Sequence, residues 1–152
     1  MSDFEHVATW AQGLLSRLEP VERRRLNRKV ATDLRRSQGQ RIAQQRNPDG
    51  SPYEPRKPRR DGKKGSIRRR AMFRKLRMAR YLRIGATDTE LTVGFFGRAG
   101  RIARVHQDGL VDRVERGGKS VRYAQRVLLG FNHSDLATIQ DAILRHLTGR
   151  EL

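Results

Sequence analysis

The chain has 152 residues, of which 36% are hydrophobic, and 34 Lys and Arg residues against 16 Asp and Glu give it a formal net charge of +18. This length predicts one domain, 1–152, and the charge makes nucleic acid the first candidate partner, before an acidic protein surface or an anionic membrane. The absence of cysteine excludes disulfides and cysteine-based zinc sites, no apolar run is long enough to span a membrane, and the N-terminus lacks a secretory signal, so a cytoplasmic protein is expected.

The first 46 residues predict two helices in an antiparallel hairpin. Ser2 and Glu5 have the spacing of a capping box, and apolar residues then recur at helical spacing as far as Leu18. Pro20 suits the first turn of a second helix, through which a narrow apolar seam runs between many charged residues. Trp10 lies beside the stripe of the first helix. We interpret it as an aromatic residue at the edge of the core, with an anchor for a neighbouring subunit as the alternative.

Residues 47–65 predict an extended basic loop rich in proline and glycine. Pro48 disfavours a helix at the residue before it, and Asp49–Gly50 is a turn signal. The wider stretch 41–80 contains 15 basic residues and three acidic ones, so it is too highly charged to form a core of its own. We expect the arm from residue 47 to residue 64 to become ordered only in an assembly.

A basic amphipathic helix is predicted after this loop, from Ser66 to Arg80. Its apolar face is thin, which leaves attachment to a membrane surface as a weaker alternative. Basic side chains of the loop and of this helix are the candidate contacts to a partner or to DNA: Arg56, Lys57, Arg59, Arg60, Lys63, Lys64, Arg68, Arg69, Arg70 and Arg74.

Two strands, 81–86 and 90–96, are predicted by alternating apolar residues on either side of a short turn. Residues 97–100 are expected to form a loop, followed by a short helix or turn that Asp108–Gly109 closes. Residues 110–122 are polar and contain two adjacent glycines, which favours an exposed loop or a β-arm.

The end of the chain predicts an extended segment, 121–131, followed by an amphipathic helix that covers one face of the sheet. Ser134 is the predicted N-cap of this helix and Gly149 ends it. The fold class is therefore α+β, with an N-terminal helical hairpin, a small antiparallel β-sheet packed by a C-terminal amphipathic helix, and an extended basic arm. Within the single domain the predicted parts are the hairpin (1–46), the loop (47–65), and the basic helix, sheet and last helix (66–152).

No residue stands out as catalytic. His106 has no serine, cysteine or paired carboxylate placed beside it by sequence, so we interpret it as a packed or hydrogen-bonding residue. Asp49 is a single carboxylate in a turn and is interpreted as a local hydrogen-bond acceptor, not a metal ligand. Phosphate loops, dinucleotide fingerprints and nucleophile elbows are absent, so neither an enzyme nor a bound cofactor or metal is expected.

Three stretches of the chain carry a resemblance to a known family. The helix end Arg41–Arg46 runs into Asn47–Lys57, which has the pattern Asp-Gly-x-x-aromatic-x-Pro followed by basic residues. Val93–Phe95 with Ile102–Gly109 forms a second block, and Arg126–Phe131 leads into the last helix. In this order they resemble the phage virion morphogenesis family, which includes the tail completion proteins of contractile-tailed phages.

Two positions depart from the family pattern. Tyr53 stands where tryptophan is usual, and Asp108 stands where phenylalanine is frequent. The resemblance implies a structural protein of the head–tail junction, found in the virion and in the host cytoplasm during assembly. It implies a homo-oligomeric ring, expected to be a hexamer, around the DNA channel. The implied partners are other copies of the chain, the tail tube and head-connector proteins, with DNA in the channel as a further candidate and no membrane.

A non-specific nucleic-acid-binding protein that uses the basic centre is the alternative function. Its affinity would depend steeply on salt, because phosphate contacts release counterions. Proteins that bind single strands interleave aromatic with basic residues, whereas the basic centre holds only Tyr53 and Phe73.

Overall fold

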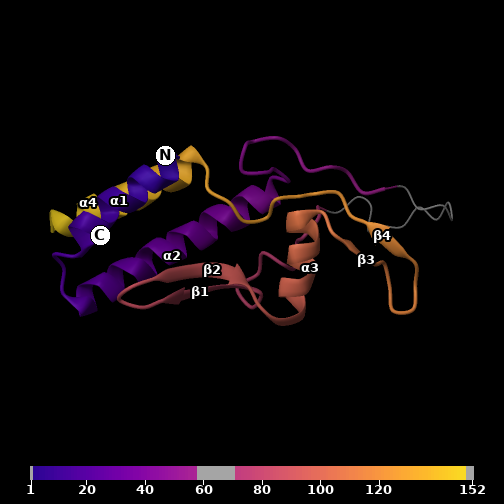
Figure 1. The fold of residues 1–152 in the computed structure, drawn as a ribbon, viewed down its shortest axis with the longest axis horizontal. Coiled ribbons are helices and arrows are strands. Elements are labelled where there is room, and N and C mark those ends of the chain that lie inside the picture. Colours follow the sequence, from indigo (N-terminus) through magenta and orange to yellow (C-terminus); the bar gives the residue numbers. More distant parts are fainter. Residues whose placement is uncertain (1, 58–70, 150–152) are drawn as a thin grey trace. The chain divides into compact units, whose positions relative to one another are not determined.

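The computed structural model describes residues 2–57 and 71–149, and within them the predicted α+β class is confirmed. The elements in chain order are α1 (Asp3–Leu15), α2 (Pro20–Ala43), β1 (Leu82–Ala86), β2 (Leu91–Phe95), α3 (Gly97–Asp108), β3 (Val111–Arg113), β4 (Ser120–Arg122) and α4 (His133–Leu147) (Figure 1). They form two compact units. The first comprises Met1–Ser37, Leu82–Gly94 and Phe131–Leu152, and the second comprises Gln38–Tyr81 and Phe95–Gly130.

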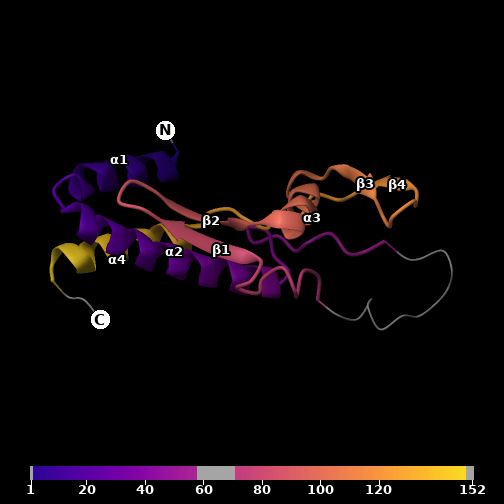
Figure 2. The ribbon, with the colours of Figure 1, turned by 90° about the horizontal axis from the view of Figure 1, so that it is seen from below.

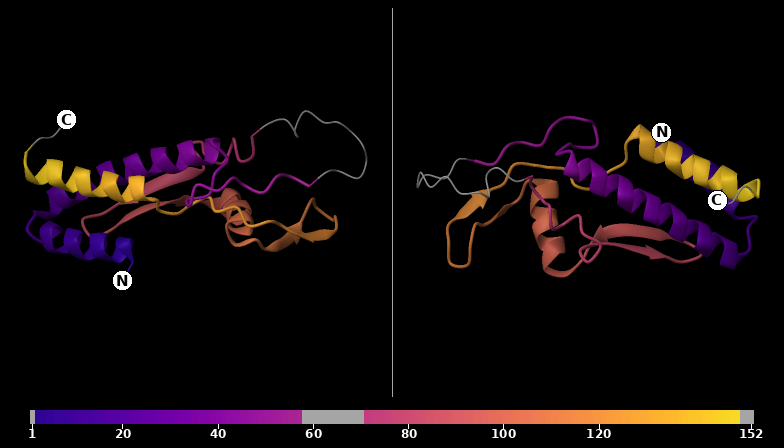
Figure 3. Two further views of the ribbon diagram at one scale, coloured as in Figure 1. Left: turned by 90° about the horizontal axis from the view of Figure 1, so that it is seen from above. Right: turned by 180° about the vertical axis from the view of Figure 1, so that it is seen from behind.

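The first unit contains the predicted helical hairpin. α1 and α4 lie along one side of the part of α2 that belongs to this unit, and the β1–β2 hairpin lies along the other (Figures 1, 2 and 3). Asn27 of α2 fixes the turn of that hairpin by donating from Nδ2 to the Thr87 carbonyl at 2.8 Å. The buried core consists of Ala11, Leu26, Val30, Leu34 and Ile143, with Leu91 and Val93 of β2 packed against it.

α4 begins two residues earlier than a cap at Ser134 predicts, because its N-cap is Asn132 and its first residue is His133. Asn132 Oδ1 accepts from the Asp135 amide at 2.8 Å, and Asp135 Oδ2 accepts from the Asn132 amide at 3.1 Å. This reciprocal pair is a capping box, which satisfies two amides of the first turn. Asp135 is fully buried and also accepts a hydrogen bond from Ser37 Oγ. The carboxylate of Asp135, three residues after the cap, therefore determines where the helix starts.

The second unit is built around α3, which is longer than expected. The expected loop at residues 97–100 is wrong, because the helix starts at Gly97. A Cβ on Gly100 would lie 2.9 Å from the Phe95 carbonyl oxygen, so glycine at this position permits a close backbone approach. The predicted β-arm is confirmed, since β3 and β4 pair antiparallel with Val111 opposite Arg122.

The helix predicted from Ser66 to Arg80 is wrong for residues 71–80, which form successive turns; residues 66–70 lie outside the described chain. Phe73 has φ +65°, in the left-handed region that interrupts a right-handed helix. This backbone lets Met72, Phe73 and Leu76 all pack into the core of the second unit. Among residues 2–57 and 71–149, no helix is both long and apolar enough to cross a membrane.

Candidate interaction site

The guanidinium of Arg41, at the end of α2, organises the second unit. Its Nη1 donates to the carbonyls of Arg46 at 3.2 Å and Val127 at 3.1 Å, and its Nη2 donates to the Leu128 carbonyl at 3.0 Å. The Arg41 side chain is buried, and so is Leu128, whose carbonyl it binds. Arg41 thus satisfies carbonyls of this extended segment in the way that a neighbouring strand would. An unsatisfied buried carbonyl costs about 1–3 kcal/mol, so these hydrogen bonds stabilise the second unit.

Two amide side chains complete the support of the extended segment. Gln107, at the end of α3, accepts with Oε1 from the amides of Leu128 at 2.8 Å and Leu129 at 3.0 Å, and its Nε2 donates to the Leu129 carbonyl at 2.8 Å. Asn47 Oδ1 accepts from the Val127 amide at 2.8 Å. The three blocks that carry the family resemblance therefore meet in one network, mostly through side chain to backbone hydrogen bonds.

The loop after α2 has a fixed shape. Asp49 Oδ1 accepts from the Ser51 amide at 2.8 Å and from the Ser51 hydroxyl, and these bonds hold the pKa of Asp49 below its usual range. The predicted role of Asp49 as a local acceptor is thus confirmed. Tyr53 is buried and donates from its hydroxyl to the Val127 carbonyl at 3.2 Å. The expectation that the arm orders only in an assembly is wrong for residues 47–55, and residues 58–64 lie outside the described chain.

Arg126 binds the backbone at the end of this loop. Its Nε donates to the Glu54 carbonyl at 2.7 Å, and its Nη2 donates to the Pro55 carbonyl at 3.1 Å. Its Nη1 lies 3.3 Å from Nδ1 of His106, where only the guanidinium can donate. Burial, with Arg126 and then Arg56 as further causes, lowers the pKa of His106 to about 4, so the ring is neutral near pH 7.

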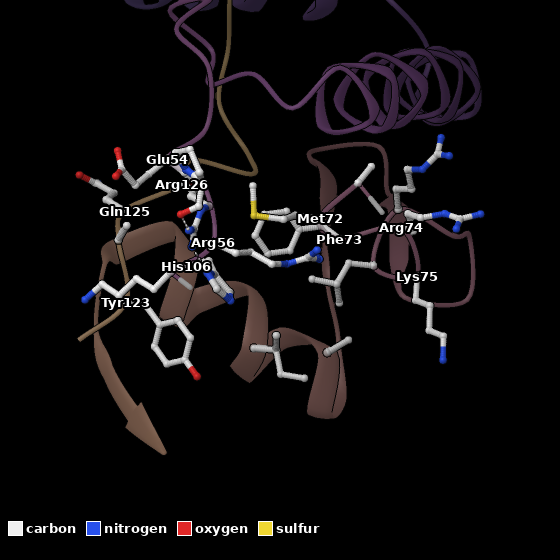
Figure 4. A pocket seen from close by; sticks show the side chains of 18 of the residues that line it. Glu54, Arg56, Met72, Phe73, Arg74, Lys75, His106, Tyr123, Gln125 and Arg126 are labelled. Carbon is white, nitrogen blue, oxygen red and sulfur yellow. Dashed lines mark hydrogen bonds between the residues drawn. The ribbon is translucent and has the colours of Figure 1, made fainter. Parts of the chain in front are cut away.

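His106 also joins an aromatic row. Its ring meets Phe73 edge to face, with centroids 4.8 Å apart, and Tyr123 in the same way at 5.0 Å. The interpretation of His106 as a packed and hydrogen-bonded residue is confirmed by these contacts. The row of Phe73, His106 and Tyr123 forms part of the wall of a large pocket (Figure 4).

This pocket of the second unit, hereafter the basic pocket, has a volume of about 1840 Å³. Basic residues far outnumber the single acidic residue, Glu54, among those that line it. The basic ones are Arg56, Lys57, Arg74, Lys75, Arg77, Arg98, Arg122 and Arg126. Aliphatic and thioether side chains line it as well: Met72, Leu76, Met78, Ile102, Val114 and Val121.

Three of the predicted contact residues, Arg56, Lys57 and Arg74, line the basic pocket. The other seven lie outside the described residues: Arg59, Arg60, Lys63, Lys64, Arg68, Arg69 and Arg70. Sequence reasoning missed the basic residues that α3 and the β-arm contribute to the pocket, because they are distant in the chain from the basic centre. Arg126 could have been predicted, since it is the first residue of one of the blocks that carry the family resemblance.

The site offers hydrogen-bond donors, positive charge and apolar contacts. Among residues 2–57 and 71–149, no group of three His, Cys, Asp or Glu side chains is placed to hold a metal ion. An anionic partner with apolar side chains would match these groups chemically.

Comparison with known proteins agrees with the resemblance. The phage virion morphogenesis family matches residues 2–148. Tail completion protein S of Escherichia phage P2 is 39% identical over 148 residues, which cover 97% of this chain and 99% of that protein. No solved structure matches the chain significantly.

Proposed function

The chain belongs to the phage virion morphogenesis family, and on that premise we propose that it is a structural protein that completes the phage tail. The observation that carries this proposal is similarity to a tail completion protein along nearly the whole length of both chains. A further support is that the blocks of the resemblance build one hydrogen-bonded network around Arg41 instead of a constellation of reactive side chains. The protein acts through contacts with other virion proteins, as a component of the head–tail junction, and not as a catalyst.

The proposal includes a homo-oligomeric ring, a hexamer around the DNA channel. The β-arm supports self-association, because within the described residues β3 and β4 pair only with each other. A two-stranded ribbon is marginally stable alone and leaves two edges open for a neighbour. Val111 on this arm is an exposed apolar residue outside the lining of the basic pocket, and a second subunit can cover it. The mass of the purified protein in solution, alone and with tail tubes, measures this, and a monomer under both conditions contradicts the ring.

Contact with DNA in the channel is the second candidate function, and the formal charge of +18 favours it. Such contact is sequence-independent and weakens by orders of magnitude between about 50 and 200 mM salt when several phosphates are neutralised. Titration with duplex DNA at these two salt concentrations tests it. Undetectable binding at the lower concentration eliminates DNA as a direct partner.

Deletion of this reading frame from its phage tests tail completion. We expect lysates with filled heads and separate, unjoined tails, which the wild-type chain supplied in trans restores to infectious particles. A triple variant, Arg68→Ala, Arg69→Ala and Arg70→Ala, removes three of the predicted contact charges and should fold normally but restore far fewer particles. Normal particles from the deletion phage contradict the proposed function, and full restoration by the triple variant removes these three residues from the contact.

A further inference from the structure

Exposed apolar side chains gather in the basic pocket. Met78, Ile102, Val114 and Val121 line it and are 49%, 44%, 59% and 36% exposed. They come from the turns after residue 71, from α3 and from the β-arm, so the second unit brings them together from distant parts of the sequence. Exposed apolar residues are ordinary when scattered, but a contiguous group rimmed by polar residues marks an interaction site.

The charge around these residues is predominantly positive. Figure 4 shows Arg56 beside Phe73, and Arg74 and Lys75 on turns that follow it. Among the described residues, no carboxylate forms an ion pair with Arg74, Lys75 or Arg98. Glu54 is the single acidic residue of the lining among the residues that the structure describes, so an acidic ligand would meet an excess of positive charge there.

The basic pocket is large enough for a polymeric ligand. Pockets for small molecules occupy roughly 300–1000 Å³, whereas this one measures about 1840 Å³. A peptide segment of several residues can fill such a volume and can offer apolar and acidic side chains at the same time.

We propose that the basic pocket binds an acidic peptide segment that carries at least one large apolar side chain and belongs to a partner protein. The apolar side chain packs against Ile102, Met72 and Met78, and the carboxylates meet the basic rim. This inference rests on the proposed function only in that the partner is another protein of the particle, and it adds the chemistry by which that protein is recognised.

A nucleic acid fits the same pocket less well. Phosphates pair with the basic rim, but they cannot use the aliphatic and thioether side chains of Met72, Met78, Ile102, Val114 and Val121. Single-strand binders stack successive bases on aromatic rings along a basic groove. Here Phe73, His106 and Tyr123 pack edge to face with one another, which leaves them less free as a row of stacking platforms.

Methionine labelling gives a direct readout of binding. The chain has three methionines, and two of them, Met72 and Met78, line the basic pocket. Short peptides are first selected from a random display library on the purified full chain. We expect the selected peptides to be rich in Asp and Glu with a Leu, Phe or Trp, and to shift the methyl resonances of Met72 and Met78. Selection of no peptide, or of peptides without acidic residues, overturns the proposal.

Matched variants then locate the bound peptide. Ile102→Asp should weaken the selected peptide by about tenfold, a loss of about 1.4 kcal/mol, while Val21→Asp, at an exposed apolar position of α2, leaves its affinity unchanged. Reversing Arg74, Lys75 and Arg98 to Glu should also weaken it at least tenfold, whereas the equal charge change at Arg24, Arg25 and Arg28 should not. Equal losses in the pocket and control variants overturn the proposal, since they reveal general charge attraction.

An oligothymidylate of the same net charge as the peptide separates the two classes of partner. If it shifts the same methionine resonances and binds as tightly as the selected peptide, the pocket is a nucleic-acid site and the proposal is overturned. Peptide binding is measured on the purified protein without tails. A failure here therefore leaves tail completion standing, while a deletion phage with normal tails refutes tail completion whatever the peptide result.

Discussion

The side chain of Gln45 pairs with the backbone of Met72 through two hydrogen bonds. Its Nε2 donates to the Met72 carbonyl at 3.0 Å, and its Oε1 accepts from the Met72 amide at 2.8 Å. Arg126 grips the Glu54 and Pro55 carbonyls in a comparable way. The second unit thus holds the chain firmly on both sides of residues 58–70, which contain seven basic residues and one acidic residue.

Replacing Gln45 tests this pairing. Gln45→Met keeps an unbranched side chain of similar length but removes both hydrogen bonds to the backbone of Met72, together with the bond from Nε2 to the Ile42 carbonyl. Each lost bond costs about 0.5–1.5 kcal/mol, so the free energy of unfolding should fall by about 2 kcal/mol in urea titrations. Gln44→Met, at an exposed neighbour, should change it by no more than about 0.5 kcal/mol. Equal effects at both positions would mean that the pairing contributes nothing.

Replacing Arg41 by lysine should destabilise the protein. An ammonium is a compact charge and cannot reach the carbonyls of Arg46, Val127 and Leu128 together as the planar guanidinium does. Arg41→Lys should lower the free energy of unfolding by about 3 kcal/mol, because hydrogen bonds to charged groups contribute about 1.5–3 kcal/mol each. Arg36→Lys in the same helix is exposed and serves as the control, with little change expected. A stability of Arg41→Lys close to wild type would contradict the supporting role given to this residue.

The start of α4 gives a comparison between two neighbouring polar residues. Asn132→Ala removes the side chain that accepts from the Asp135 amide and should cost about 1 kcal/mol. Ser134→Ala removes the residue that sequence alone favours as the cap, but it lies inside the helix and should cost little. Thermal unfolding of both variants measures the difference. A larger loss for Ser134→Ala than for Asn132→Ala would place the cap where the sequence placed it.

Local signals in the sequence predicted the elements well. The capping box of Ser2 and Glu5, the proline at the start of α2 and the apolar alternation around the β1–β2 turn each act within a few residues, so each can be read without the fold. The start of α3 was missed because Gly97 and Gly100 read as loop residues. Their actual role depends on how closely Phe95 approaches.

The site could be predicted only in part. Arg56, Lys57 and Arg74 follow from charge alone, since a basic run must meet solvent or an anion. The partners of Arg41 and Gln107 could not be predicted, because the carbonyls and amides they bind belong to residues far along the chain and every residue type offers the same backbone groups. Phe73 was wrongly predicted to lie in a helix for a similar reason. The core contacts that stabilise its left-handed backbone are tertiary.

Stability should depend on pH through His106. Its pKa in the folded protein is about 4, below the usual 6.5, since the ring is partly buried and Arg126 and Arg56 disfavour a second positive charge. Between pH 6.5 and 4 the unfolded chain binds a proton that the folded chain does not, so the free energy of unfolding should fall as the pH is lowered through this window. Above pH 6.5 both states are neutral at this residue and no dependence arises from it.

The variant His106→Asn separates this effect from other titrating groups. Asn cannot be protonated in this range, so the loss of stability between pH 7 and pH 4.5 should be smaller in the variant than in the wild type, as measured by urea titration at each pH. His133→Asn is the matched control, because His133 is 94% exposed at its side chain. If His106→Asn keeps the wild-type pH dependence and His133→Asn reduces it, protonation of His106 is not the cause of the loss of stability at low pH.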